Sequence, residues 1–241
     1  YVSYNGFLKV KGSTLVNQYN NEIQLRGLSS HGLQWYSDLI TTENLQYLKE
    51  NFNINVFRIA MYTAENGYIN NKETIKQKAI EITDMAISLD LYVIIDWHIL
   101  SDGNPNMYKD EAKEFFDEFS NKYKNVPNVI YEICNEPNGQ NVTWDNDVKP
   151  YAEEIIPVIR NNSPKSLVIV GTPNWCRDLD KVINNTLDFD NVLYSCHFYA
   201  GSHLKEIKEK LQIAFDNKLP VFVSEWGTTN YTGDGNPYEN E

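Results

Sequence analysis

Seven short apolar stretches, separated by stretches with helical periodicity, constrain the fold of this chain more than any other feature of its sequence. Several are nearly continuous and rich in β-branched residues, which is typical of parallel strands covered on both faces. They lie at residues 23–27, 54–59, 91–96, 129–133, 167–170, 192–196 and 219–223. Strict alternation of strand and helix predicts right-handed crossovers and one parallel sheet.

Helical patterns fill the intervals between these stretches. In three of them, apolar residues recur at the spacing of one helix face. These sets are Ile75, Ala79, Ile82, Ala86 and Leu89; Ala112, Phe115, Phe119 and Tyr123; and Leu204, Ile207, Leu211 and Ala214. Residues 43–51 and 147–161 are also predicted to be helical, and Pro157 predicts a kink or an irregular start in the second of them. Residues 173–190 are less regular.

Seven such strands without a dinucleotide-type glycine loop favour a (β/α)8 barrel, the TIM barrel, over an open doubly wound sheet. Residues 6–10 and 14–16 predict a small hairpin that closes the bottom of the barrel. The 241 residues are enough for one sizeable core, so we expect a single domain over residues 1–241.

The predicted barrel is one strand short. Residues 226–241 are polar and rich in turn-forming residues, and they show neither a helical nor a strand pattern. We therefore expect an α/β fold, a (β/α)8 TIM barrel truncated after strand seven. Because open sheet edges and an open core are costly, we also expect either reduced stability or completion by a neighbouring chain or a missing C-terminal segment.

Charge and composition exclude several classes of partner. A net charge of −12 argues against nucleic acids and anionic membranes. No apolar stretch reaches the length of a membrane span, and the first residues lack the pattern of a signal peptide. This start fits either a cytoplasmic protein or the processed form of a secreted one. Three cysteines without a C-x-x-C spacing and four scattered histidines predict neither a disulfide framework nor a metal site, and no cofactor is expected.

Polar and ionisable residues follow the strand-like stretches, at the ends where a parallel barrel gathers its functional groups. They are His31, Arg58, His98, Asn135, Glu136, His197, Tyr199 and Glu225. Two carboxyl groups that converge from different strands, one protonated and one ionised, are what cleavage of a glycosidic bond requires. We interpret Arg58 as the group that keeps the attacking carboxylate ionised.

The motifs around the two glutamates resemble those of glycoside hydrolase family five. The resemblance rests on Asn135-Glu136-Pro137 after the fourth strand and Glu225-Trp226-Gly227 after the seventh. Further segments, at residues 29–36, 57–62, 96–98 and 171–175, resemble the bacterial endo-β-1,4-glucanase branch of that family. The resemblance runs from about residue 4 to the end of the chain.

This resemblance implies roles for the residues nearest to the cleaved bond. Glu136 would be the general acid/base and Glu225 the nucleophile of a retaining hydrolase. Asn135 would hold the 2-hydroxyl group of the sugar. The resemblance also implies supporting residues: Arg58 and Tyr199 would orient Glu225, His197 would contact Glu136, and His31 and His98 would line the subsite at the cleaved bond.

The resemblance further implies how a glucan chain is held. Trp35, Tyr36 and Tyr62 would lie on the non-reducing side of the cleft, and Trp175 on the leaving-group side. Tyr231 and Thr232 would make weaker contacts. The family also places a tryptophan at the end of strand eight, and this chain has no residue at that position.

The sequence thus predicts a secreted endo-β-1,4-glucanase that binds β-1,4-glucan oligosaccharides or polysaccharides and cleaves them with retention. A non-catalytic glucan-binding fragment, inactive because of the truncation, is one alternative. The same chemistry on mannan or xyloglucan is another, because specificity depends on pocket contacts.

Overall fold

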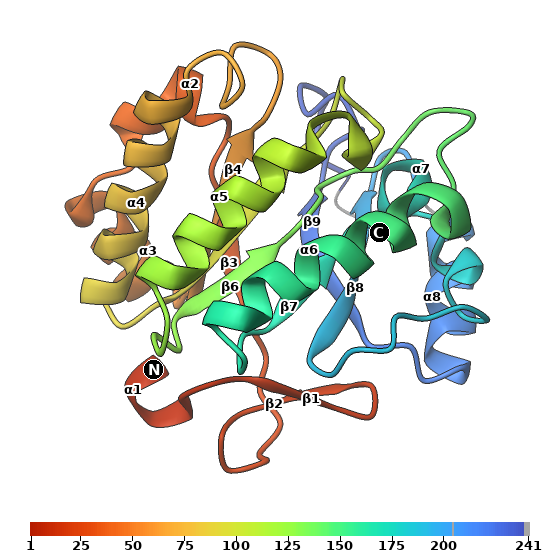
Figure 1. Ribbon diagram of the computed structural model, residues 1–241, viewed down its shortest axis with the longest axis horizontal. Coiled ribbons are helices and arrows are strands. Elements are labelled where there is room, and N and C mark those ends of the chain that lie inside the picture. The colour runs from red at the N-terminus through yellow and green to blue at the C-terminus, as the bar shows by residue number, and fades with distance from the viewer. Residues whose placement is uncertain (204, 239–241) are drawn as a thin grey trace.

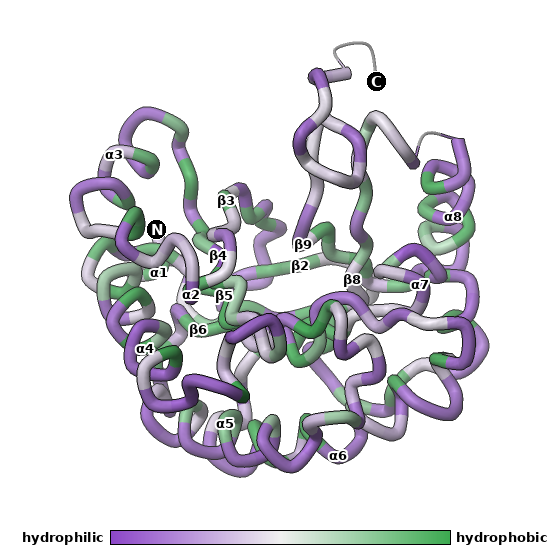
Figure 2. Tube along the Cα trace, turned by 90° about the horizontal axis from the view of Figure 1, so that it is seen from above, coloured by the Kyte–Doolittle hydropathy of each residue, from purple (hydrophilic) through white to green (hydrophobic). Residues whose placement is uncertain are grey.

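The computed structural model describes residues 1–203 and 205–238. Seven parallel strands form one sheet in the order β3-β4-β5-β6-β7-β8-β9, which is also their order along the chain. They are β3 (Gly27–Ser29), β4 (Val56–Tyr62), β5 (Tyr92–His98), β6 (Val129–Glu132), β7 (Val168–Val170), β8 (Val192–Tyr199) and β9 (Val221–Gly227). Seen from above, the strands curve around a common centre and the helices lie outside them (Figure 2). The prediction of a parallel barrel architecture with seven strands is confirmed.

Helices connect successive strands and cover the outer face of the sheet (Figure 1). The longer ones are α3 (Thr42–Phe52), α4 (Lys72–Ser88), α5 (Lys109–Lys122), α6 (Lys149–Asn162) and α8 (Lys205–Asp216). The predicted helices are confirmed, although Leu204 lies outside the described residues. Helix α6 continues through Pro157, and a π-helical turn, η3 (Trp144–Val148), precedes it as the irregular start.

Short helical segments occupy the loops. They are α1 (Val2–Asn5), α2 (Leu33–Tyr36), η1 (Ser37–Leu39), η2 (Pro105–Tyr108), α7 (Pro173–Cys176) and η4 (Leu179–Lys181). Among the described residues, no helix is both long and apolar enough to cross a lipid bilayer.

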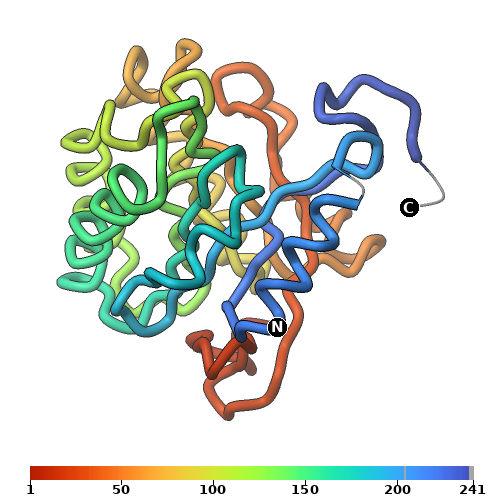
Figure 3. Tube along the Cα trace, turned by 90° about the vertical axis from the view of Figure 1, so that its right-hand side faces the viewer, coloured from red at the N-terminus to blue at the C-terminus, as the bar shows by residue number. Residues whose placement is uncertain are grey.

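A two-stranded hairpin covers the N-terminal ends of the barrel strands (Figures 1 and 3). It consists of β1 (Lys9–Lys11) and β2 (Thr14–Val16), paired antiparallel. Leu8 and the partly buried Val10 and Leu15 pack against the first inward-facing residues of the sheet, such as Tyr92. The predicted closure of the barrel bottom is therefore confirmed.

Alternation of side chains along each strand separates two cores. Outward-facing residues such as Phe57 and Ile95 pack against the helices. Inward-facing residues are apolar near the hairpin. They become polar and charged toward the C-terminal ends, where Arg58, Asp96 and Glu132 are at most 3% exposed. The barrel thus places a layer of buried charged residues near the C-terminal ends of its strands.

The predicted strand boundaries were wrong in two ways. The apolar stretch predicts the first strand at residues 23–27, whereas β3 spans Gly27–Ser29. Strands β4, β5, β8 and β9 continue two to four residues beyond the apolar stretches to Tyr62, His98, Tyr199 and Gly227. In β5, β8 and β9 the reason is that the polar residues His98, His197 and Glu225 point into the barrel, where the buried charged layer supplies their partners and parallel pairing continues.

Strands β3 and β9 form the two edges of the sheet among the described residues. After Gly227, residues 228–238 form turns without a helix or strand, as predicted, and Gly201 N–H donates to Thr229 O. Completion of the barrel by a further segment or a neighbouring chain stays a prediction.

Candidate active site

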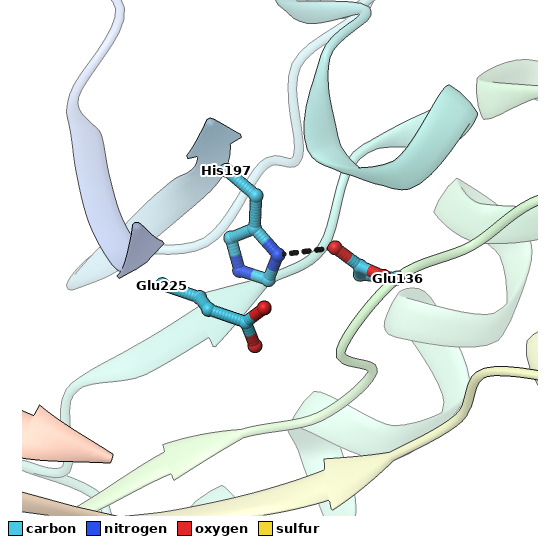
Figure 4. A group of neighbouring side chains, drawn as sticks. All are labelled: Glu136, His197 and Glu225. Carbon is cyan, nitrogen blue, oxygen red and sulfur yellow. Dashed lines mark hydrogen bonds and ion pairs between the residues drawn. The ribbon is translucent and has the colours of Figure 1, made fainter. Parts of the chain in front are cut away.

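The two glutamates singled out from the sequence converge at the C-terminal end of the barrel. Glu136 follows β6, Glu225 belongs to β9, and His197 of β8 lies beside both (Figure 4). One carboxylate oxygen of each glutamate and one ring nitrogen of His197 all lie within 4.8 Å of one another. Carboxyl groups of retaining glycosidases are about 5–5.5 Å apart and those of inverting enzymes about 6.5–9.5 Å. The observed approach matches the shorter spacing.

Glu225 is surrounded by groups that favour its ionised form. The Tyr199 hydroxyl donates to Oε1 at 2.6 Å, and Arg58 Nη1 donates to Oε2 at 3.2 Å. Burial by itself would raise the pKa of Glu225, but the charges of His197 and Arg58 and the Tyr199 hydrogen bond outweigh it, and the pKa falls to about 2. Glu225 is therefore a carboxylate at neutral pH.

Arg58 does more than was predicted for it. Besides Glu225, its guanidinium donates to Glu132 Oε2 at 2.7 Å and lies 2.9 Å from Asp96 Oδ2. Burial would raise the pKa of Glu132, yet the charges and hydrogen bonds of Arg58 and His197 together outweigh it and lower the pKa to about 2. Burial raises the pKa of Asp96 despite Arg58. The sequence predicted no role for either buried carboxylate: Asp96 opens the segment at residues 96–98 but has no predicted function there, and Glu132 lies inside an apolar stretch without a motif.

A bulge in β9 determines which residues face the site. Ser195 pairs with Phe222, but His197, two residues on, pairs with Glu225, three residues on. The extra residue in β9 lets both Ser224 and Glu225 point into the barrel, although consecutive strand residues normally face opposite sides. Bulges re-aim side chains in this way next to active sites.

His197 connects Glu136 to the buried charged layer. Its Nδ1 lies 2.8 Å from Glu136 Oε1 and its Nε2 lies 2.8 Å from Ser224 Oγ, which donates to Glu132 Oε1 at 2.6 Å. Burial would lower the pKa of His197, but Glu132, Glu136 and Glu225 together raise it to about 10. His197 is therefore cationic at neutral pH. Sequence reasoning predicted its contact with Glu136 and missed Ser224.

The only His, Cys, Asp and Glu donors that cluster closely enough for a metal ion, among the described residues, are Glu136, His197 and Glu225. A metal ligand must offer a neutral ring nitrogen, and both nitrogens of the cationic His197 already have hydrogen-bond partners. This donor set suits proton transfer better than metal binding. The expected lack of a metal and of any other cofactor stays a prediction.

The raised pKa of His197 predicts a loss of stability at alkaline pH. A histidine whose folded pKa exceeds its ordinary value of 6.5 stabilises the fold fully below pH 6.5, and this contribution disappears as the pH rises toward 10. We expect the free energy of unfolding, measured with urea at several pH values, to fall between pH 6.5 and 10. The fall should be smaller in His197→Gln.

The control for this prediction is His203→Gln. Burial lowers the pKa of His203 below its ordinary value of 6.5, so this residue loses its charge in the folded chain first and in the unfolded chain as the pH rises past 6.5, and it carries no charge in either at alkaline pH. Its loss should leave the slope between pH 6.5 and 10 unchanged. Equal slopes in the parent and His197→Gln would contradict the assignment of a cationic His197.

The glutamates lie in a cleft of about 1300 Å³. The predicted residues that line it are His31, Tyr62, His98, Glu136, Trp175, His197, Tyr199, Glu225, Tyr231 and Thr232. Sequence reasoning missed Arg177, Ser202, His203 and Trp226, which also line it. Of these, Trp226 follows Glu225 directly and has an exposed ring, so its position in the motif was the available signal.

Two predicted residues lie beneath the cleft. Asn135 is fully buried, accepts from Arg58 Nη2 at 2.7 Å, and donates to Ile99 O at 3.0 Å. Arg58 is 3% exposed. The structure thus supports a positioning role for Arg58, whereas the contact of Asn135 with a sugar hydroxyl stays a prediction.

Aromatic rings form a continuous row from the cleft outward. Tyr62 stacks on His98 with a centroid distance of 4.1 Å and lies parallel to His31 at 5.8 Å. Trp35 lies 5.1 Å from Tyr62, and Tyr36 lies 5.3 Å from His31. Trp35 and Tyr36 do not line the main cleft. They are about half exposed and extend the row beyond it.

Trp175 stands at the rim of the cleft on an unusual loop. Asn174, Trp175 and Cys176 all have positive φ near 55–58°, a conformation that side chains disfavour. Trp175 N–H donates to Pro137 O at 3.1 Å, and the Arg177 guanidinium lies 5.7 Å from the indole ring. These contacts hold the indole next to the loop that bears Glu136.

Comparison with known proteins agrees with this geometry. The sequence model described as "Cellulase (glycosyl hydrolase family 5)" matches residues 16–241. The chain is 49% identical to an endoglucanase of Clostridium saccharobutylicum over 99% of its own length and 53% of the relative's. It is 52% identical to endoglucanase A of Evansella cellulosilytica over 91% of its own length and 45% of the relative's. The chain thus spans about half the length of the curated relatives it matches.

Solved structures give the same result. The catalytic domain of Thermobifida fusca endoglucanase Cel5A is 40% identical, with a TM-score of 0.94 over 98% of this chain and 79% of that one. A glutamate-to-glutamine variant of that domain has been solved with cellotetraose, at 39% identity and a TM-score of 0.94. Its match likewise covers 98% of this chain and 79% of that one.

Proposed function

The chain belongs to glycosyl hydrolase family 5, the cellulases, and from this premise we propose that it is an endo-β-1,4-glucanase that hydrolyses cellulose-type glucans with retention. The observation that supports this best is the approach of Glu136 and Glu225 to within 4.8 Å in different electrostatic surroundings. A spacing this short leaves room for direct attack by one carboxylate and no room for an intervening water.

In the first step, Glu225 attacks the anomeric carbon and Glu136 gives a proton to the leaving glycosidic oxygen. The lowered pKa of Glu225 keeps it nucleophilic, and burial beside Glu225 raises the pKa of Tyr199, which keeps its donating proton. A covalent glycosyl-enzyme results. In the second step, Glu136 removes a proton from water, which displaces Glu225.

His197 is proposed to assist Glu136 in both steps. Its Nε2 is committed to Ser224, so the proton at Nδ1 points at Glu136 Oε1. A cation at this place stabilises the carboxylate that Glu136 becomes after donating its proton. This is electrostatic stabilisation of a charge that develops during the reaction.

The remaining predicted residues are proposed to bind the glucan. Asn135 would hold the 2-hydroxyl group, and His31 and His98 would line the subsite at the cleaved bond. The other proposed subsite residues are Trp35, Tyr36 and Tyr62 on the non-reducing side, Trp175 on the leaving-group side, and Tyr231 and Thr232 as weaker contacts. Aromatic rings suit this role because the faces of a sugar ring are apolar.

We propose further that residues 1–241 belong to a single catalytic domain and that the protein acts outside the cell, where a polymeric glucan is accessible. One observation supports the alternative that the chain is a glucan-binding fragment without catalytic activity. Leu28 on the edge strand β3 is 46% exposed and lines the cleft, which therefore extends to the open edge of the sheet.

The test is release of reducing ends from carboxymethylcellulose, with mannan and xyloglucan in parallel. We expect the highest rate on the glucan and a β-configured first product by NMR. Binding to glucan without any release of reducing ends would favour the non-catalytic alternative. A higher rate on mannan or xyloglucan would identify that polymer as the substrate of the same reaction.

Glu136→Ala is expected to lower kcat on carboxymethylcellulose by about 10²–10⁴-fold, the usual contribution of general acid–base catalysis. An aryl cellobioside with an acidic phenol should lose less in its first step, because its leaving group departs without a proton. Steady-state and burst kinetics measure both. The exposed Glu153→Ala is the control and should keep parental rates. Equal losses on the two substrates would argue against Glu136 as the proton donor.

A further inference from the structure

A second pocket lies beyond Trp35, next to the β3–β4 side of the cleft. It has a volume of about 280 Å³, close to the lower end of the range for small-molecule pockets. It is lined by Gln34, Trp35, Asn66, Asn71, Thr74, Ile75 and Lys78. Because the Trp35 ring also lies 5.1 Å from Tyr62, which lines the main cleft, one aromatic side chain joins the two cavities.

The lining of this pocket suits a neutral polyhydroxylated ring. Trp35 is 48% exposed and offers an indole ring. Around it lie the exposed amides of Asn66 and Asn71, the Thr74 hydroxyl and the Lys78 ammonium group. An apolar face with a few convergent donors and acceptors is the usual composition of a ligand pocket. Among the described residues, none of those lining it is acidic.

The wall of the pocket is held rigidly. Glu65 and Asn66 both have positive φ, and a side chain at Gly67 would collide with Tyr62 O. The turn is closed by Gly67 N–H to Ala64 O at 2.7 Å and by Asn71 Nδ2 to Asn66 O at 2.8 Å. A preformed wall lowers the entropy cost of binding a ligand.

The Lys78 ammonium group at the pocket can make further hydrogen bonds. Gln34 Nε2 donates to Glu65 O at 3.2 Å, which ties Gln34 to the turn that forms the wall. Lys78 Nζ bonds Ser37 Oγ, and an ammonium group has two further protons to donate.

We propose that this pocket is a distal glucosyl subsite, which binds one further glucose unit of a chain that runs from the main cleft across Trp35. The proposal rests on the proposed glucanase function and specifies its substrate: longer cello-oligosaccharides gain affinity that shorter ones lack. Asn66 and Lys78 determine this gain, and neither belongs to the catalytic machinery.

The test measures binding in a Glu225→Gln background, so that it does not depend on turnover. Isothermal titration calorimetry with cellotriose, cellotetraose, cellopentaose and cellohexaose gives the gain in affinity with length. Adding Asn66→Gly and Lys78→Met should reduce this gain about three- to tenfold, the value of one or two hydrogen bonds, and leave cellotriose binding unchanged. Glycine accepts the positive φ of residue 66, so this change avoids strain. Asn70→Gly, which does not line the pocket, is the matched control.

The same variants with Glu225 intact are then compared by kcat/KM on cellotetraose and cellohexaose. A lower hexaose-to-tetraose ratio in Asn66→Gly/Lys78→Met alone supports the subsite. An affinity gain that is absent in the parent, or equal in the double variant and Asn70→Gly, overturns it. Failure of the parent chain to cleave any oligosaccharide would refute the glucanase proposal instead, and the calorimetric result would still decide on the subsite.

Discussion

Glu225→Gln is expected to abolish hydrolysis of β-1,4-glucan, with kcat at least about 10³-fold lower, while cellotetraose still binds. The amide preserves the shape of the side chain and can still accept from Tyr199, but it has no charge to attack the anomeric carbon. In the parent chain, His197, Arg58 and Tyr199 lower the pKa of Glu225 to about 2 despite its burial, so the nucleophile is ionised throughout the neutral range. Reducing-end release measures the loss, and calorimetry measures binding.

The matched control is Glu22→Gln, an exposed glutamate next to the hairpin at the opposite end of the barrel. It should keep the parental rate. Hydrolysis by Glu225→Gln within tenfold of the parent would show that Glu225 is not the nucleophile. If cellotetraose binding disappeared together with activity, Glu225 would be required for the shape of the cleft, and the loss of rate would not identify its chemical role.

Arg58→Met is expected to lower the free energy of unfolding by about 3–5 kcal/mol, because removing one partner of a buried ion pair leaves uncompensated charge. Arg58 is 3% exposed and contacts Glu132 at 2.7 Å, Asp96 at 2.9 Å and Glu225 at 3.2 Å. Methionine replaces the stem of the side chain and removes the charge. Urea unfolding followed by circular dichroism measures the loss at pH 7.

This loss should depend on pH with a definite sign. Arg58, together with His197, lowers the folded pKa of Glu132 and Glu225 to about 2, so the stabilisation by Arg58 is present above pH 4.5 and disappears as the pH falls toward 2. The difference between parent and variant should therefore shrink below pH 4.5. Arg26→Met, at an exposed arginine, should change stability by less than about 0.5 kcal/mol. A loss below about 1 kcal/mol for Arg58→Met would contradict the central role of this guanidinium.

Much of the fold could be predicted because periodicity is local. The spacing of Ile75, Ala79 and Ile82 predicts α4 without reference to any distant residue, and the β-branched stretches predict the strands. The boundaries are less accurate: the polar residues Asp96 and His98 predict a strand that ends at residue 96, whereas β5 continues to His98. They belong to β5 because other strands supply their partners: Arg58 lies 2.9 Å from Asp96, and Asn135 lies 3.2 Å from His98 Nε2.

The sequence by itself determined the alternation of strands and helices, and hence that Glu136 and Glu225 follow strands whose C-terminal ends meet. Only the tertiary structure decided how these groups are arranged. The bulge in β9 turns both Ser224 and Glu225 inward, so His197 is held between Ser224 and Glu136 while Arg58 reaches Glu225. The physical reason is that a bulge and a buried charge network arise from pairing between strands far apart in sequence. Their residues have no mutual spacing from which contact could be read.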